Sequence, residues 1–199
     1  MAEPTEEPAA PAARRAVVGL GNPGERYRDT RHNLGFRVVE ALAGRLGTPL
    51  ARTECNARVG GPARGPLLVA PQTYMNRSGY ALRCLVERHG FEPGEVLVVY
   101  DEVALPLGKL RVRPGGSPGG HRGMESVVEN LRTDRVPRLR LGCAGAEGTP
   151  AGEELVDYVL SPFGSEEREA AEEMVERAAD ACETWLREGI EAAMNRFNG

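Results

Sequence analysis

The sequence lacks the features that mark a membrane-spanning or exported chain. None of its apolar stretches approaches the ~20 residues that cross a bilayer. The first residues are rich in Ala, Pro and Glu and contain no apolar signal-peptide core. We therefore predict a disordered tail over residues 1–15 and one folded domain over residues 16–199. The expected location is the cytoplasm, with no membrane partner.

Cysteine is scarce, and the four cysteines form no C-x-x-C pair. Metal sites and disulfide frameworks usually need more closely spaced cysteines. We expect reduced, partly buried thiols, which agrees with a cytoplasmic location. The four residues are Cys55, Cys84, Cys143 and Cys182.

The net charge of −4 argues against nucleic-acid binding, but the charge is unevenly distributed. Residues 109–140 contain eight basic and three acidic residues, a local charge of +5. Residues 153–191 contain thirteen acidic and three basic residues, a local charge of −10. A local basic face on an acidic protein can still bind phosphates. Ordinary solvated surface charge explains the same pattern equally well.

Apolar runs alternate with segments of helical periodicity, which predicts an α/β fold. Strands are expected at residues 16–20, 67–70, 96–100, 109–113, 139–143 and 155–160. Helices are expected at residues 34–46, 78–89, 122–131, 166–187 and 191–195.

Four short polar motifs stand beside apolar runs. Since sites in α/β sheets form at the carboxyl ends of strands, Asn22, Asn76 and Asp101 are expected to converge on one edge. A histidine can act as a base at neutral pH, a carboxylate fixes its tautomer, and amides hold a carbonyl group. This set suits a water-activating ester hydrolase, although His32, Asn22 and Asn76 taken singly are better explained as surface, turn or capping residues. The motifs are GNPG (21–24), TRHN (30–33), YMNRSG (74–79) and YDE (100–102).

Two other interpretations of these motifs fail. Residues 19–24 match G-x-G-x-x-G, but no helix begins within the glycines and no strand ending in Asp or Glu follows about twenty residues later. Dinucleotide binding is therefore not predicted. Ser78 lacks the G-x-S-x-G elbow of a serine nucleophile, so a serine hydrolase is not predicted either.

In order and approximate spacing, several segments together resemble the bacterial peptidyl-tRNA hydrolase family. The resemblance implies cleavage of the ester between a peptide and the 3′ end of tRNA, without metal or cofactor, which recycles tRNA after aborted translation. It implies a single α/β domain with a twisted mixed sheet sandwiched between helices. The catalytic positions fall on His32, Asp101, Asn22 and Asn76. The segments are VVGLGNPGERYRDTRHNLGF, PQTYMNRSG, VLVVYDEVALPLGKLRVR, GGHRGMESV and AMNRFN.

The resemblance also implies a monomer whose partner is the acceptor stem and CCA end of tRNA. Acceptor-stem phosphates would lie at Arg113 and Arg140, within the basic segment. Many relatives have Asn where this chain has Arg122, a longer and charged donor that is expected to alter substrate preference or rate. The other substrate-binding positions would be Tyr27, Tyr74, Asn76 and His121.

Two alternatives to an ordinary hydrolase remain open. Some relatives have lost hydrolysis and bind RNA, but the complete set of catalytic residues disfavours that interpretation. A specialised paralogue that uses Arg122 to act on another acyl-tRNA is the second alternative. Cleavage assays on N-acetyl-aminoacyl-tRNA and free aminoacyl-tRNA separate these possibilities.

Overall fold

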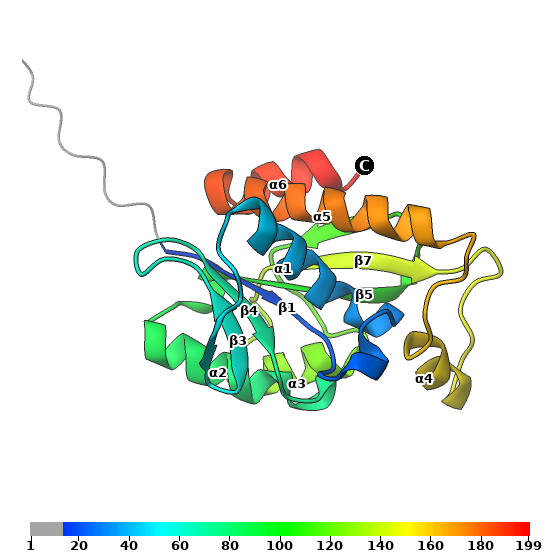
Figure 1. The fold of residues 1–199 in the computed structure, drawn as a ribbon, viewed down its shortest axis with the longest axis horizontal. Coiled ribbons are helices and arrows are strands. Elements are labelled where there is room, and N and C mark those ends of the chain that lie inside the picture. Colours follow the sequence, from blue (N-terminus) through cyan, green and yellow to red (C-terminus); the bar gives the residue numbers. More distant parts are fainter. Residues whose placement is uncertain (1–13) are drawn as a thin grey trace, which may run out of the picture.

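A mixed β-sheet between two layers of helices forms the body of the protein (Figure 1). The computed structural model describes residues 14–199. The predicted α/β fold is therefore confirmed. The strands are β1 (Ala16–Gly19), β2 (Arg52–Glu54), β3 (Ala57–Gly60), β4 (Leu67–Pro71), β5 (Val96–Pro106), β6 (Leu110–Arg113) and β7 (Arg138–Ala144). The helices are α1 (Leu34–Arg45), α2 (Ser78–His89), α3 (Arg122–Leu131), α4 (Glu153–Val159), α5 (Arg168–Glu188) and α6 (Ile190–Phe197).

The strand order is β2-β3-β4-β1-β5-β7-β6. The four central strands β4, β1, β5 and β7 are parallel, whereas β2, β3 and β6 run antiparallel to their neighbours. After β1 the chain builds β2, β3 and β4 on one side of β1, and it later forms β5 on the other side. The sheet therefore reverses its order of growth beside β1, and the carboxyl ends of the strands there are where an α/β sheet places a site.

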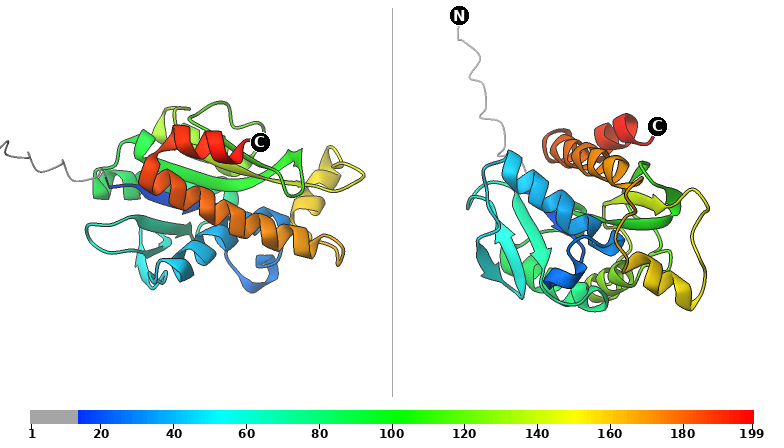
Figure 2. Two further views of the ribbon diagram at one scale, coloured as in Figure 1. Left: turned by 90° about the horizontal axis from the view of Figure 1, so that it is seen from above. Right: turned by 45° about the vertical axis from the view of Figure 1, so that its right-hand side comes forward.

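The two faces of the sheet bury separate hydrophobic clusters (Figures 1 and 2). Helices α1, α5 and α6 cover one face, with residues such as Leu42 and Trp185 in the core. Helices α2 and α3 cover the other face, with Leu85 and Met124 in the core. The continuous apolar run in β5 follows from this arrangement, because its side chains are buried on both faces.

At two glycines a helix approaches a neighbouring element more closely than any larger residue would allow. A Cβ atom on Gly35 of α1 would lie 2.3 Å from the carbonyl oxygen of Val99 in β5. A Cβ atom on Gly79 of α2 would lie 1.9 Å from the carbonyl oxygen of Ser126 in α3. The first contact brings the start of α1 against β5, and the second brings the start of α2 against α3. Both helix starts carry motifs singled out in the sequence.

The structure corrects some sequence-based element assignments. The predicted strand at residues 155–160 is wrong, because residues 153–159 form helix α4. The sequence analysis also missed the hairpin of β2 and β3. Its turn residues Cys55 and Asn56 both have positive φ, the conformation of a tight hairpin turn that is usually filled by Asn or Gly.

The prediction of four reduced cysteines is also wrong, because Cys55 and Cys84 form a disulfide bond. The bond joins the hairpin turn to the middle of α2, across 29 positions of sequence. Spacing along the chain did not reveal this pair because the fold brings the two elements together. Cys143 and Cys182 are free and buried, and burial raises the pKa of both thiols. The cysteines therefore give no support to a cytoplasmic location.

Reduction of this disulfide is expected to lower the free energy of unfolding by about 3.5 kcal/mol, because the bond restricts a loop of the unfolded chain. Urea denaturation with and without dithiothreitol measures the change. The Cys84→Ser variant is the control, since dithiothreitol should not destabilise it further. Equal denaturation midpoints for oxidised and reduced wild-type protein would contradict this expectation.

Both ends of the described chain are attached to the sheet or its helices. Arg14 donates to the Gly65 carbonyl group, and Arg15 donates to the Trp185 carbonyl group at 2.5 Å. These two residues of the predicted tail are thus bound to the domain, and residues 1–13 lie outside the described part. At the other end, the Asn198 side chain accepts from the Val112 N–H and donates to the Val112 carbonyl group on the outer edge of β6. In residues 14–199, no helix combines the length and apolar character of a membrane span.

Candidate active site

A cleft of about 460 Å³ opens at the carboxyl ends of the central strands. Its wall combines polar side chains from the predicted motifs with an apolar stretch from α4 and the following residue. Asn22 follows β1, Asn76 follows β4, and Asp101 belongs to β5, so the predicted convergence on one edge is observed. The lining residues are Asn22, His32, Tyr74, Met75, Asn76, Asp101, Glu102, Val103, Gly119, Gly120, His121, Arg122, Leu155, Val156, Val159 and Leu160.

His32 and Asp101 form a hydrogen-bonded pair at the bottom of the site. His32 lies in a 3₁₀ turn directly before α1, and Asp101 is only 1% exposed. His32 Nδ1 lies 2.9 Å from Asp101 Oδ1 and 3.0 Å from Oδ2. Because an ionised carboxylate can only accept, Nδ1 carries the proton and Nε2 keeps a free lone pair. His32 is therefore in the tautomer that a general base requires.

His121 is a second imidazole on the same carboxylate. It is the N-cap residue of α3, and its Nδ1 accepts the Met124 N–H at 3.2 Å. This capping bond requires a lone pair on Nδ1, so the proton lies on Nε2, which donates to Asp101 Oδ1 at 3.0 Å. The His121 ring also packs against Tyr100, with 4.6 Å between ring centroids. The start of α3 thus fixes the tautomer of His121 and keeps it pointed at Asp101.

The pKa values of His32 and Asp101 shift in opposite directions. Burial alone would lower the pKa of His32, but the charge of Asp101 and its hydrogen bond outweigh burial and raise the pKa above 6.5. Burial alone would raise the pKa of Asp101, but the two imidazoles lower it well below its ordinary value. Asp101 therefore stays ionised over the pH range in which the protonation of His32 changes.

Asn22 is oriented by its neighbours before any substrate arrives. Its side-chain Oδ1 accepts the Met75 N–H at 2.8 Å, so its amide N–H groups remain available toward the cleft. The Asn33 side chain accepts the Asn22 N–H and donates to the Asn22 carbonyl group, both at 2.9 Å. Asn22 is thereby connected both to the residue after His32 and to the loop that carries Asn76.

Most, but not all, of the predicted substrate-binding residues line the cleft. Tyr74, Asn76, His121 and Arg122 are lining residues. Tyr27 is not among them, and its ring lies under the guanidinium group of Arg26. The close packing of α2 on α3 explains why the loop before α2 and the start of α3 share one wall.

Arg113 and Arg140 lie outside the cleft on the neighbouring strands β6 and β7. Arg113 is exposed, whereas Arg140 donates to Glu102 Oε2 at 3.0 Å. The adjacent Arg138 is buried and binds three backbone carbonyl groups, so it adds no positive charge to the surface. The basic segment therefore presents less free charge than its residue count suggests.

Sequence reasoning missed Asn33, which holds Asn22 in place, and the apolar wall of the cleft. Asn33 stood next to His32 in a motif, but nothing in the sequence indicated that it would hold Asn22. The apolar wall from Leu155, Val156, Val159 and Leu160 was hidden because this segment was assigned to a strand. The spacing of these four residues, at three and four positions, was the available signal for a helix.

A metal ion is geometrically conceivable only at this centre, within the part of the chain that the structure describes. The ligand atoms of His32, Asp101 and His121 lie within 4.8 Å of one another. However, the capping bond to Met124 places the His121 proton on Nε2, the atom that would have to bind the metal. The geometry therefore favours a hydrogen-bonded group over a metal site.

The fold and the site define an α/β protein with a histidine–carboxylate pair at the carboxyl edge of its sheet, an arrangement typical of hydrolases that use histidine as a base. A family model described as peptidyl-tRNA hydrolase matches residues 16–199. The chain belongs to the peptidyl-tRNA hydrolase family, and the resemblance found in the sequence is confirmed.

Individual relatives agree with this assignment. A peptidyl-tRNA hydrolase of Methylacidiphilum infernorum is 46% identical over 92% of this chain and 96% of its own length. One from Chloroflexus aggregans is 48% identical over 92% of this chain and 97% of its own length. A crystal structure of the peptidyl-tRNA hydrolase of Acinetobacter baumannii is 31% identical, with a TM-score of 0.85 over 96% of this chain and 98% of that one.

Proposed function

We propose that this protein hydrolyses the ester bond of peptidyl-tRNA and releases free tRNA and the peptide. The observation that carries the proposal is the pairing of His32 with Asp101, which leaves Nε2 free in a cleft that also contains the Asn22 amide. Membership of the peptidyl-tRNA hydrolase family supports the choice of substrate. The cytoplasm, where translation takes place, is the proposed location.

The proposed reaction needs one water molecule. His32 Nε2 removes a proton from the water molecule, and the water oxygen attacks the ester carbonyl carbon. The carbonyl oxygen becomes negatively charged, and the amide N–H groups of Asn22 and Asn76 stabilise it. Protonated His32 then gives the proton to the 3′ oxygen of the departing ribose. No covalent enzyme intermediate forms, and Asp101 stays ionised throughout because both imidazoles donate to it.

Two regions of the surface match two chemically different parts of the proposed substrate, the peptide and the tRNA acceptor stem. The apolar wall of the cleft suits the peptide, and the exposed Arg113 suits a phosphate of the acceptor stem. The CCA end would connect the two regions. Arg122, exposed at the edge of the cleft, would face the peptide side. The active species is proposed to be a monomer without metal or cofactor.

The decisive assay compares N-acetyl-aminoacyl-tRNA with free aminoacyl-tRNA. We expect rapid cleavage of the first, little cleavage of the second, and the same rates in EDTA when a short acylated substrate is used. Preferential cleavage of free aminoacyl-tRNA would favour a specialised paralogue. Tight binding of RNA without any cleavage would favour the RNA-binding alternative and contradict the proposal.

Replacement of Arg113 by Ala is expected to raise KM for peptidyl-tRNA and to flatten its salt dependence by about one unit of log-log slope or less. A phosphate contact positions the substrate without reading sequence, so cleavage of a minimal peptidyl-adenosine should hardly change. The Arg140→Ala variant should show the same pattern. It also leaves the half-buried Glu102 carboxylate unpaired, which makes Arg113 the cleaner test.

Both substrates are measured across a salt series. Arg187→Ala is the matched control, because Arg187 is an exposed, ion-paired arginine on the acidic helix α5. Its replacement should leave the salt dependence unchanged. Equal losses on peptidyl-tRNA and peptidyl-adenosine would show that Arg113 serves folding or chemistry and not phosphate binding.

A further inference from the structure

Arg31, the residue before His32, is a buried arginine whose role the proposed reaction leaves open. It is 6% exposed, and its guanidinium group binds the segment between α4 and α5. Nη1 donates to the Pro162 carbonyl group at 2.6 Å and to Ser161 Oγ at 2.9 Å. Nη2 donates to Glu167 Oε2 at 2.6 Å.

Three further contacts attach the same segment to Arg31. The Arg31 N–H donates to the Ser161 carbonyl group at 3.1 Å. The guanidinium carbon lies 4.3 Å from the ring centroid of Tyr158 and 4.9 Å from that of Phe163. Glu167 Oε2 also accepts the Gly164 N–H, so its ion pair with Arg31 closes the turn into α5. Arg31 therefore contacts residues 158–167 along their length, from Tyr158 at the end of α4 to Glu167 at the start of α5.

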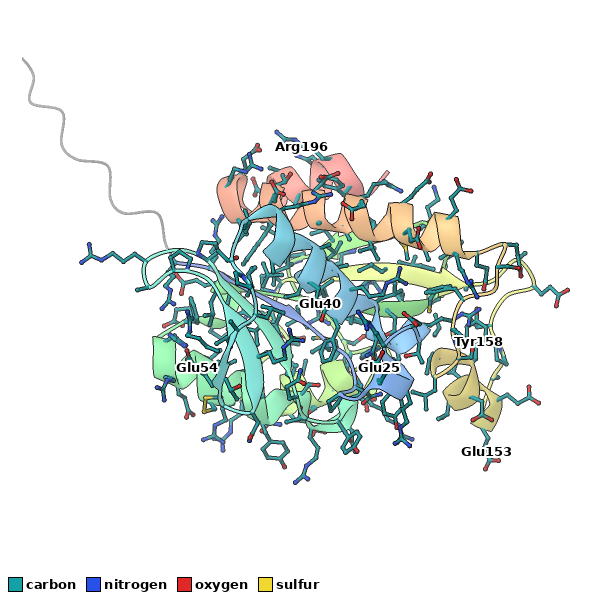
Figure 3. All side chains as sticks on the ribbon, viewed as in Figure 1. Glu25, Glu40, Glu54, Glu153, Tyr158 and Arg196 are labelled. Atoms are coloured by element: carbon teal, nitrogen blue, oxygen red, sulfur yellow. A yellow bond between two sulfur atoms is a disulfide. The ribbon has the colours of Figure 1, made fainter. Side chains whose placement is uncertain are left out.

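α4 is attached to the body of the protein by anchors at its carboxyl end, of which Arg31 is the first. None of its residues is buried, and in Figure 1 it stands apart from the two helical layers. Its second anchor is Tyr158, whose hydroxyl group donates to the Cys143 carbonyl group and accepts the Gly145 N–H. Figure 3 shows Tyr158 at the end of α4 that faces the sheet. Its neighbours Val159 and Leu160 line the cleft.

We infer that Arg31 is a positioning residue that sets the distance between the base His32 and the apolar wall of Val159 and Leu160. The wall then binds an apolar side chain at the carboxyl end of the peptide, next to the ester. This inference rests on the proposed function and adds a substrate preference to it. Two neighbouring residues of the chain then serve the two parts of the site: His32 is the proposed base for the attacking water, and Arg31 holds the surface that selects the acyl group.

Arginine is required here because of its shape. Its planar guanidinium group donates in several directions at once and stacks on aromatic rings, whereas a lysine ammonium group can do neither equally well. Arg31→Lys keeps the positive charge and should loosen the wall without adding a buried unpaired acid at Glu167. Glu167→Gln weakens the ion pair with Arg31, and Tyr158→Phe removes the hydroxyl bonds to Cys143 and Gly145. Both substitutions should loosen the same apolar wall while Arg31 itself stays in place.

The experiment compares kcat and KM for N-acetyl-leucyl-tRNA and N-acetyl-glycyl-tRNA. Wild-type protein should prefer the leucyl substrate by about tenfold in kcat/KM, the discrimination that burial of an aliphatic side chain supplies. Arg31→Lys, Glu167→Gln and Tyr158→Phe should each reduce this ratio toward one, by raising KM for the leucyl substrate. The ratio does not depend on the fraction of folded enzyme, so a loss of stability alone cannot change it.

Arg45→Lys is the matched control. Arg45 also joins α1 to α5 through ion pairs with Glu176 and Asp180, but none of these residues lines the cleft. The Arg45→Lys variant should keep the wild-type ratio of kcat/KM for the leucyl and glycyl substrates. The midpoint of the acid limb of kcat should be the same in Arg31→Lys as in wild-type protein, because the His32–Asp101 pair is intact.

The outcomes separate this inference from the proposed function. Absence of cleavage of either substrate by the folded wild-type protein would contradict the function. Cleavage without a leucyl preference, or a preference that survives in all three wall variants, would overturn the inference and leave the function standing. A shifted acid limb in Arg31→Lys would show that Arg31 acts on His32 and not on the wall.

Discussion

Replacement of His32 by Ala is expected to reduce kcat/KM for peptidyl-tRNA by ~10²–10⁴-fold, the usual effect of removing a general base. The expectation follows from the geometry of the site. His32 Nδ1 donates to Asp101, which leaves Nε2 as the acceptor that faces the cleft. The other imidazole that lines the cleft does not replace it, since His121 Nε2 donates its proton to Asp101. Single-turnover cleavage of N-acetyl-aminoacyl-tRNA measures the effect.

His89→Ala is the control for the loss of an imidazole elsewhere in the fold. His89 lies at the end of α2, contacts Glu54 at 2.8 Å and is not among the residues that line the cleft. This variant should retain activity close to that of the wild type. Circular dichroism and a denaturation midpoint establish that His32→Ala is folded. Activity of a folded His32→Ala variant within threefold of the wild type would remove His32 from the mechanism.

Replacement of Asp101 by Asn is expected to reduce the rate within the same ~10²–10⁴-fold range but by less than His32→Ala does, because it removes orientation and charge while the His32 imidazole remains. Asp101 is nearly fully buried and accepts from two imidazoles. An amide at this position has one accepting oxygen, and its N–H groups would face a ring nitrogen that already carries a proton. Part of the His32 population should therefore adopt the wrong tautomer.

The same substitution should move the pH profile in a defined direction. Only neutral His32 can accept a proton, so wild-type activity is lost as pH falls through a His32 pKa that lies above 6.5. In Asp101→Asn the negative charge that raises this pKa is gone, whereas the burial that lowers it remains. The acid limb of kcat/KM should therefore move to lower pH. A profile of kcat/KM from acid to neutral pH, with a short acylated substrate, measures the shift, and an unmoved limb would contradict the role of Asp101.

The parts of the fold that the sequence predicted correctly are those with strong local signals. β1, β4 and the first five residues of β5 are continuous apolar runs, and α1 and α2 end close to Gly47 and Gly90, a residue type that commonly follows a helix. The convergence of Asn22, Asn76 and Asp101 followed from a general rule about parallel sheets. His32 was harder to place, because its position against β5 depends on the close approach of Gly35, which a sequence pattern does not reveal.

Other features depended on contacts between distant segments. β2 and β3 are short and partly exposed, so they leave little hydrophobic pattern. The Cys55–Cys84 bond joins elements whose proximity is a property of the folded chain. α4 is mostly exposed, and its apolar residues serve the cleft and not the core, so its composition resembled a short edge strand. His121 appeared as a substrate contact, and only the structure revealed its bond to Asp101.

The hydrogen bonds of Asn198 along β6 have a consequence for behaviour at high protein concentration. β6 is the last strand of the sheet, and an uncovered outer strand offers its backbone to a strand of another molecule. Asn198 occupies both the N–H and the carbonyl group of Val112, as an additional strand would. Asn198 should therefore hinder edge-to-edge aggregation. A chain shortened before Asn198 would leave the Val112 N–H and carbonyl groups free to pair with a strand of another molecule.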